Sequence, residues 1–418
     1  MENKKLSTSL TDSRFGGWGW SMIFYCMILY FFYAALTTDG QNLFPAAFAN
    51  LHGWDENALL AYASPAGILG IIGGFVFGRL ILKTNSRIIS SVTLIVTGVL
   101  FAVFGMVTSI TLYIAVLVLI CFFAAGFGTI ACPAFMAAWF PRKKGIALGW
   151  ATMGAPLSSA FFVTGFSLLL DKCGVKTAFL IVGIATVIIG VLSFFWAKND
   201  PAEVGALPDH MELDDSFQLE EKPVDDKAFS IANILKNKNT WLIAIGFGLL
   251  WMVTVGVISQ FIPRMISVGY TSAEALRFML ISSLIAIPGS YFWGWLDSKT
   301  GTKMASVVYA ASYVIALILL ITSFHPVLVW IGCIFVGLGI GGLLNLLSSM
   351  IISAFGRDGF MSANSIIMPI ASIIRVLAFL VMAMLLQVSG GSFTLPYFVF
   401  IGIDVVGAII ILLIPVKK

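Results

Sequence analysis

The 418-residue sequence has few charged residues, at 11% of the chain against about 25% in an ordinary soluble domain. Its three histidines lie far apart, and its five cysteines lie mostly inside apolar runs, so we expect neither a metal site nor a disulfide framework. It lacks a Gly-rich phosphate-binding loop and a Ser/His/Asp set at one depth, which argues against an ATP-driven pump and an enzyme. We expect no cofactor, no nucleic-acid partner and no removable signal peptide.

Hydrophobic residues make up 59% of the chain instead, far more apolar surface than a soluble protein can hide from water. The sequence therefore predicts an all-α integral membrane protein whose partner is the lipid bilayer. A membrane-spanning helix takes roughly 20 residues. The apolar stretches of this length lie at about 18–38, 57–78, 88–108, 111–133, 145–170, 177–197, 240–262, 273–296, 304–323, 326–352, 363–388 and 395–415.

The basic residues are distributed unevenly between the two sides of these twelve predicted spans. One side carries 19 of the 24 lysines and arginines, including those near both chain ends. Cytoplasmic loops of membrane proteins carry an excess of Lys and Arg. The prediction is a multi-pass protein of the cell inner (plasma) membrane with both termini in the cytoplasm.

One long polar stretch, residues 198–238, interrupts the apolar pattern. It holds ten acidic residues, five lysines and three prolines, so we expect a flexible cytoplasmic linker that ends in a short surface helix. The linker divides the chain into two six-span parts, residues 1–197 and 239–418.

The loops of the two parts repeat each other. Four residues after the second span have counterparts 216 positions later, after the eighth span. These pairs are Gly78/Gly294, Leu80/Leu296, Lys83/Lys299 and Arg87/Lys303. Phe140 and Arg142 are matched by Phe355 and Arg357 at an offset of 215, which again follows the fourth span of each part. Two such matches in equivalent loops indicate an internal duplication.

These loops resemble the signature of the major facilitator superfamily, in which Gly, Leu and Asp precede basic residues around a second Gly. The second copy, GWLDSKTGTK at 294–303, keeps most of this pattern, whereas the first has Leu82 and Asn85 in place of the Asp and the second Gly. The resemblance implies a monomer of two pseudo-symmetric six-helix bundles around a central cavity that works by alternating access. It also implies a cytoplasmic gate formed by Arg79, Lys83, Arg87, Arg142, Asp297, Lys299, Lys303 and Arg357.

A narrower resemblance is to the monocarboxylate and oxalate/formate antiporter branch. It rests on AGFGTI at 125–130 with WFPRKKGIALG at 139–149, and on DPAEVGALPD at 200–209. The resemblance implies a small carboxylate as substrate. Ser290 and Tyr291 stand where the branch has its first cation, and Arg375 lies one turn beyond the place of its second. The two-cation site of that branch is therefore not reproduced.

Ionisable residues inside membrane spans are costly and mark functional sites. Arg375 lies about 12 residues into the eleventh span, about 18 Å deep. It either clamps a substrate carboxylate with its planar fork or forms a structural ion pair with Asp404 of the twelfth span. Asp39, at the end of the first span, is either a proton-coupling carboxylate or a solvated helix terminus, and Asp404 is a second proton-coupling candidate.

Polar and aromatic residues of other spans complete the predicted site. The polar residues of the tenth span either hydrogen-bond a substrate or hold neighbouring helices together. The aromatic residues either line a binding pocket or pack against other helices and lipid. The predicted substrate-binding residues are Arg375, Asn345, Ser348, Ser349, Tyr30, Tyr33 and Trp251.

The function predicted from these features is secondary active transport of a small organic anion, a mono- or dicarboxylate, by proton symport or anion exchange. Two other transport functions stay open. One is transport of a zwitterion such as a betaine or amino acid, with Arg375 for its anionic group and Asp39 or an aromatic wall for its cation, and the other is multidrug efflux. An integral membrane enzyme would need a polar catalytic cluster, which the sequence does not offer.

Overall fold

The computed structural model describes residues 14–55, 58–59, 62–210, 230–322 and 325–415. All regular secondary structure in these residues is helical, and nine of their helices are long and apolar enough to cross a membrane. The predicted all-α membrane fold is confirmed.

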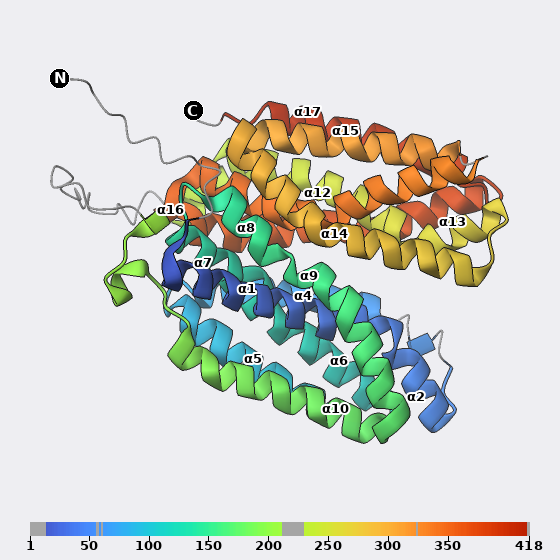
Figure 1. The fold of residues 1–418 in the computed structure, drawn as a ribbon, viewed down its shortest axis with the longest axis horizontal. Helices are drawn as coiled ribbons and strands as arrows, with labels where there is room; N and C mark the ends of the chain where they lie inside the picture. Colours follow the sequence, from blue (N-terminus) through green and yellow to red (C-terminus); the bar gives the residue numbers. More distant parts are fainter. Residues whose placement is uncertain (1–13, 56–57, 60–61, 211–229, 323–324, 416–418) are drawn as a thin grey trace.

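The helices before residue 197 pack together into an amino-terminal bundle (Figure 1). Its elements are α1 (Gly16–Thr37), the 3₁₀ turn η1 (Asp39–Asn42), α2 (Phe44–His52), α4 (Ala63–Leu80), α5 (Ser86–Phe104), α6 (Ile110–Ala125), the π-helical η2 (Gly126–Ala131), α7 (Cys132–Trp139), α8 (Lys144–Thr152), α9 (Gly154–Leu157), the π-helical η3 (Ser158–Phe162) and α10 (Val163–Trp196).

The helices after residue 230 form a carboxyl-terminal bundle. Its elements are α11 (Ile231–Lys236), α12 (Lys238–Ser259), α13 (Phe261–Val268), α14 (Ser272–Thr300), α15 (Thr302–Ile321), α16 (Pro326–Val388) and α17 (Thr394–Leu412).

Two of these helices are too long for one membrane crossing, and a glycine interrupts each. Gly174 in α10 has φ 74° and Gly356 in α16 has φ 71°, a left-handed conformation that glycine adopts without steric cost. The chain turns back at these two points. Counting the shorter apolar helix α4, the described residues supply a helical segment for every predicted span.

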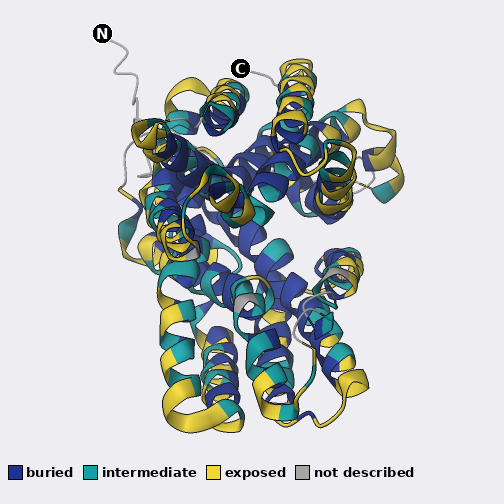
Figure 2. Ribbon diagram, turned by 90° about the vertical axis from the view of Figure 1, so that its right-hand side faces the viewer, coloured by how far each residue is buried: buried dark blue, intermediate teal, exposed yellow. Residues whose placement is uncertain are grey.

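The two bundles converge at the end of the molecule that carries both chain ends and diverge toward the other end (Figure 1). We call the first the basic end, because Arg87, Arg142, Lys144 and Arg357 lie there, and the second the opposite end. Exposed residues cover the outer helix faces (Figure 2), with large apolar side chains such as Phe195 among them. These faces suit contact with lipid rather than water.

Candidate functional site

Arg375 lies where α16 crosses α12. Its guanidinium carbon stands 4.7 Å from the centre of the Trp251 ring, in cation–π geometry. Gly248, one turn before Trp251, allows this close crossing, because a Cβ atom there would lie only 2.9 Å from the Cβ of Ile374. The tight helix contact therefore fixes the guanidinium over the tryptophan face.

Tyr33 of α1 approaches Arg375 from the other bundle, near enough for an electrostatic interaction between the two side chains. Its ring packs directly on Gly128, where a Cβ atom would meet the ring at 2.3 Å. Gly128 belongs to the π-helical segment η2, a local distortion that is frequent at functional sites. Arg375, Trp251 and Tyr33, predicted separately, are thus brought together between the bundles.

Arg375 and Asp404 do not form the ion pair that the sequence left open. The described residues give the Arg375 guanidinium no hydrogen bond and no ion pair. Asp404 is fully buried on α17, and both of its carboxyl oxygens are without a hydrogen-bond partner among the described residues. The cation in the eleventh span is therefore available to an anion from outside the chain.

The remaining predicted substrate-binding residues lie elsewhere. Asn345 donates from its side-chain amide to the Ser290 carbonyl at 3.2 Å, which joins α16 to α14 within one bundle. Ser348 is fully buried, and its hydroxyl has no partner among the described residues. Ser349 donates to the Asp297 carboxylate at the basic end. Tyr30 is buried in the apolar cluster described below.

Asp39 is held by the amino-terminal bundle at its opposite end. The hydroxyls of Ser158 and Ser159 donate to its carboxylate at 2.6 and 2.9 Å. Both serines belong to the π-helical segment η3. Asp39 is thus hydrogen-bonded to the fifth span while it remains partly exposed.

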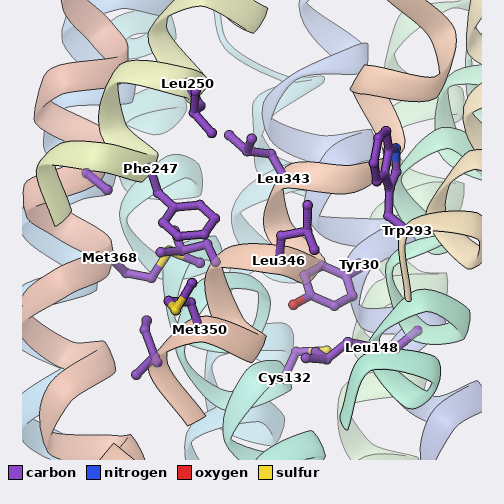
Figure 3. Close-up of a cluster of buried hydrophobic side chains, with 14 of the residues drawn as sticks. Tyr30, Cys132, Leu148, Phe247, Leu250, Trp293, Leu343, Leu346, Met350 and Met368 are labelled. Carbon is purple, nitrogen blue, oxygen red and sulfur yellow. The ribbon is translucent and has the colours of Figure 1, made fainter. Parts of the chain in front are cut away.

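Buried apolar side chains from both bundles, some of them drawn in Figure 3, form a layer at the interface on the basic side of this site. The amino-terminal bundle contributes Tyr30 and Leu148, and the carboxyl-terminal bundle contributes Leu346, Met350 and Met368, all nearly inaccessible to solvent. Such a layer blocks the passage of water and ions between the bundles.

A polar latch, formed by Lys144, Asp297, Ser349 and Ser353, lies beyond the apolar layer. The Lys144 ammonium donates to the Ser349 carbonyl at 3.0 Å and to the Ser353 hydroxyl, and it interacts electrostatically with Asp297. Lys299, a predicted gate residue, does not reach the other bundle, because its ammonium lies 4.9 Å from the centre of the Trp295 ring. The basic residue near Asp297 comes from the other bundle, whereas its hydrogen-bond donor Ser349 belongs to its own bundle.

Helices α8 and α14 touch through their backbones beside the latch. A Cβ atom on Gly294 would lie 2.3 Å from the Gly145 carbonyl oxygen and 2.9 Å from the Cα of Gly149. Gly145 and Gly149 are four residues apart, the small-xxx-small spacing that lets membrane helices approach closely. The hydrogen bonds that cross between the bundles and join two described residues all lie in this basic half.

Residues 198–210, the docked linker segment, are ordered against the basic end, which corrects the prediction of a flexible linker for this part. They contain the 3₁₀ turns η4 (Pro201–Val204) and η5 (Pro208–His210). The Asp209 carboxylate accepts the backbone N–H of Arg142 at 3.0 Å and of Lys143 at 2.8 Å. Burial raises the pKa of Asp209, although these N–H groups act in the opposite direction.

The docked linker segment also connects the two bundles. Asp200 forms an ion pair with Arg357 of α16, whereas Glu203 pairs with Arg87 of the amino-terminal bundle at 3.3 Å. The predicted gate residues Arg142 and Arg357 thus each contact an acidic residue of the linker, Arg142 through its backbone N–H and Arg357 through its side chain. Residues 211–229 lie outside the described residues.

Three other predicted gate residues take no part in contacts between the bundles. Arg79 and Lys83 are exposed. The Lys303 ammonium donates to the Ile414 carbonyl at 3.1 Å, inside the carboxyl-terminal bundle. Among the described residues, the charged side chains in contacts that link the two bundles include Lys144, Arg357 and its linker partner Asp200, with Asp297 close to Lys144.

Breaking the Asp200–Arg357 pair should weaken closure at the basic end. Asp200→Asn removes the charge but keeps the side-chain oxygen that accepts the Ala202 N–H at 2.9 Å and begins η4. Both side chains are about a third exposed or more, at 33% and 43%, so the loss is about 0.2–1 kcal/mol. Spin labels on cysteines at the exposed positions 84 and 358 should report a larger open fraction, by up to about fivefold.

The matched control is Glu203→Gln, which breaks a pair of similar exposure that stays on the amino-terminal side. Cys173, the exposed natural cysteine, is replaced by Ser in all of these proteins so that it takes no label. Equal distance distributions in both variants would show that Asp200 does not hold the bundles together.

The sequence model of the Major Facilitator Superfamily matches residues 86–378. The chain belongs to the major facilitator superfamily. It is similar over 94% of its length to the crystal structure of the human organic anion transporter MFSD10 (TM-score 0.69, 12% identity), of which it covers 97%. At that identity the likeness shows the fold alone. As a member of this superfamily, the chain is a membrane transporter and not an enzyme.

Two curated relatives in this superfamily resemble the chain at low identity. The oxalate:formate antiporter of Oxalobacter formigenes is 26% identical over 178 residues, 42% of this chain and 40% of the antiporter. The inner membrane transport protein RhmT of Escherichia coli (strain K12) is 24% identical over 324 residues, 73% of this chain and 69% of RhmT. The chain thus matches less than half of the antiporter's length.

Several residues at the polar latch, in the docked linker segment and around Asp39 at the opposite end could not be predicted from the sequence. Ser158 and Ser159 gave no signal, because two serines in an apolar helix carry no partner information. Lys144 is predicted only as a basic loop residue, because it directly follows Arg142 and Lys143 after Pro141 and nothing in its spacing indicates a partner. Asp200 lies within the antiporter-like segment at 200–209, but nothing in the sequence indicates a role for it at the gate.

Proposed function

We propose that the chain is a secondary active transporter of a small organic anion, a mono- or dicarboxylate, and that Arg375 holds the anionic group. The observation that carries this proposal is a guanidinium within the second membrane-crossing part of α16 that forms no ion pair with a described carboxylate. Guanidinium presents a planar fork of donors that matches a carboxylate in two parallel hydrogen bonds. Trp251 covers one face of the guanidinium and leaves its donor edge for the anion.

The bundles supply the second requirement of such a transporter, a barrier that moves. The apolar layer and the polar latch close the basic side, and the bundles diverge on the other side (Figure 1). Rocking of the two bundles about the Arg375 site would open the basic end and close the opposite end, as in alternating access. In this proposal residues 1–197 and residues 239–418 are the two parts that move relative to each other, and residues 198–238 are the linker between them.

Counterflow in proteoliposomes tests the proposal directly. Vesicles loaded with one unlabelled mono- or dicarboxylate should take up the same labelled anion faster than empty vesicles. The panel includes a betaine, an amino acid and a cationic drug. Uptake of one of these without uptake of any carboxylate would overturn the anion proposal. The zwitterion is disfavoured beforehand, because Arg375 already occupies the aromatic face that would hold its cation.

We further propose that the basic end faces the cytoplasm of a cell whose inner membrane holds the protein as a monomer. Of the five cysteines only Cys173 is exposed, and it lies between Lys172 and Gly174 at the opposite end. A membrane-impermeant maleimide should therefore label the protein in intact cells, and Cys173→Ser should abolish that labelling. Labelling that appears only after the membrane is permeabilised would reverse the orientation.

A further inference from the structure

The inner stripe of α17 contains a carboxyl group that the Arg375 site does not use. Buried residues recur along this helix at spacings of three and four, as Tyr397, Phe400, Asp404, Gly407 and Ile411. This period places all of them on the face that packs into the bundle. Asp404 therefore occupies a position that an apolar side chain would otherwise fill.

The packing around Asp404 leaves it without access to solvent. Gly407, one turn further on, brings α17 close to α12, because a Cβ atom there would lie 3.0 Å from Leu250 and 3.1 Å from the Gly246 carbonyl oxygen. Asp404 is 0% exposed. Neither carboxyl oxygen has a hydrogen-bond partner among the described residues.

Two tyrosines of α15 lie near this carboxyl group. They are Tyr309 and Tyr313, and their rings stack 5.9 Å apart. The Tyr309 hydroxyl is committed, since it donates to the Gly339 carbonyl at 2.9 Å and shares a hydrogen bond with Thr254. The hydroxyls of Tyr313 and Tyr397 are buried without a partner in the described residues.

The charged groups near this cluster lie at its two ends. At the opposite end, the Arg264 guanidinium of α13 stands 6.0 Å from the Tyr397 ring and donates to the Leu320 carbonyl at 2.6 Å. At the basic end, Lys303 reaches α17 only at the Ile414 carbonyl. No described basic side chain forms an ion pair with Asp404.

A carboxylate held in an apolar interior with no donor around it is far costlier than the neutral acid. The neutral acid carries one O–H, which can donate to a nearby hydroxyl oxygen, and tyrosine hydroxyls both donate and accept. Arg264, Tyr397, Tyr313 and Asp404 form a sequence of polar groups that runs from the opposite end to the middle of the carboxyl-terminal bundle. Such a row of polar groups can pass a proton from one group to the next, and the close packing of the helices around it leaves no room for a larger ligand.

We propose that Asp404 is a proton-binding site, separate from the Arg375 anion site, and that Tyr397 and Tyr313 line its proton route from the opposite end. This proposal rests on the proposed function, and it assigns proton symport as the mode of anion transport. The carboxylate takes up one proton to become the acid and releases it on the other side, and no other bond forms or breaks. A monoanion and one proton then cross together without net charge.

Infrared spectroscopy of the purified protein tests the proton site without any substrate. The wild-type spectrum should contain the C=O stretching band of a protonated carboxylic acid, and Asp404→Asn should lose that component. Asp404→Glu, which keeps a carboxyl group, should retain a shifted band. The control Asp171→Asn changes an exposed carboxyl group and should leave the band unchanged. Identical wild-type and Asp404→Asn spectra would overturn the proposal.

Transport tests the coupling. Across a pH gradient of one unit, wild-type vesicles should accumulate a monoanion about tenfold on the alkaline side, and Asp404→Asn should lose this accumulation. A single elution peak and an unchanged helical circular dichroism spectrum establish that the variant is folded. Undiminished accumulation in Asp404→Asn would overturn the coupling. If the wild-type protein moved no carboxylate, the proposed function would fail, while the infrared result would still decide the proton site.

Discussion

Arg375→Gln should abolish counterflow of small carboxylates in proteoliposomes while the protein still inserts and folds. A hydrogen bond to a charged group contributes about 1.5–3 kcal/mol, so loss of a two-bond fork weakens anion binding by about a hundredfold or more. Arg375→Lys keeps the charge but loses the fork, so binding should weaken and partly survive. Arg277→Gln, which removes an exposed arginine at the opposite end, is the matched control and should transport normally.

A double variant separates this role from a structural one. If Arg375 served only to balance Asp404, Arg375→Gln combined with Asp404→Asn would regain counterflow, because no buried charge would then stand alone. The two side chains form no ion pair, so we expect no recovery. Carboxylate counterflow at the wild-type rate in Arg375→Gln or in the double variant would refute the proposal that Arg375 holds the anion.

Gly294→Val should hold the transporter open at the basic end. The added side chain would meet the backbone of Gly145 at 2.3 Å, and a backbone atom cannot move aside as a flexible side chain can. Overpacking costs about 1–3 kcal/mol, which lowers the population closed at the basic end by about 5- to 150-fold. Counterflow should fall accordingly, and the spin-label distance between positions 84 and 358 should increase.

The matched control is Gly402→Val on α17, where the same added side chain would meet open space. Normal counterflow and a short spin-label distance in Gly294→Val would mean that the α8–α14 contact is not required for closure. A loss of counterflow in both variants would instead point to a general effect on the membrane helices.

The sequence predicts how deep in the membrane a residue lies, but it does not predict toward which side of the helix its side chain points. Arg375 and Asp404 both lie near the middle of their spans, which made them candidate partners. The structure turns Arg375 toward the space between the bundles and Asp404 into one bundle. Ser348 and Ser349 differ in the same way, since one residue corresponds to about 100° of helix rotation and only Ser349 reaches Asp297.

The superfamily resemblance predicts a gate in the repeated loops, but sequence could not predict the partners of the residues there. Partners across the gate come from the other bundle or from the linker, so their spacing in sequence carries no regular signal. Lys144 reaches Ser349 across 205 positions, and Arg357 reaches Asp200 across 157. Aromatic residues were equally ambiguous, because Tyr30 and Tyr33 are one turn apart and only Tyr33 approaches Arg375.

The contact of Gly145 and Gly149 with Gly294 also bears on how readily the closed state can be left. Glycine has no side-chain rotamers, so this part of the contact forms without the loss of conformational entropy that longer side chains would suffer. At this contact, closure therefore depends on the complementary shapes of the two helix backbones and not on fixing the rotamers of many side chains. The conformations that are closed and open at the basic end can then remain close in free energy, so that binding or release of a small ligand is enough to shift the equilibrium between them.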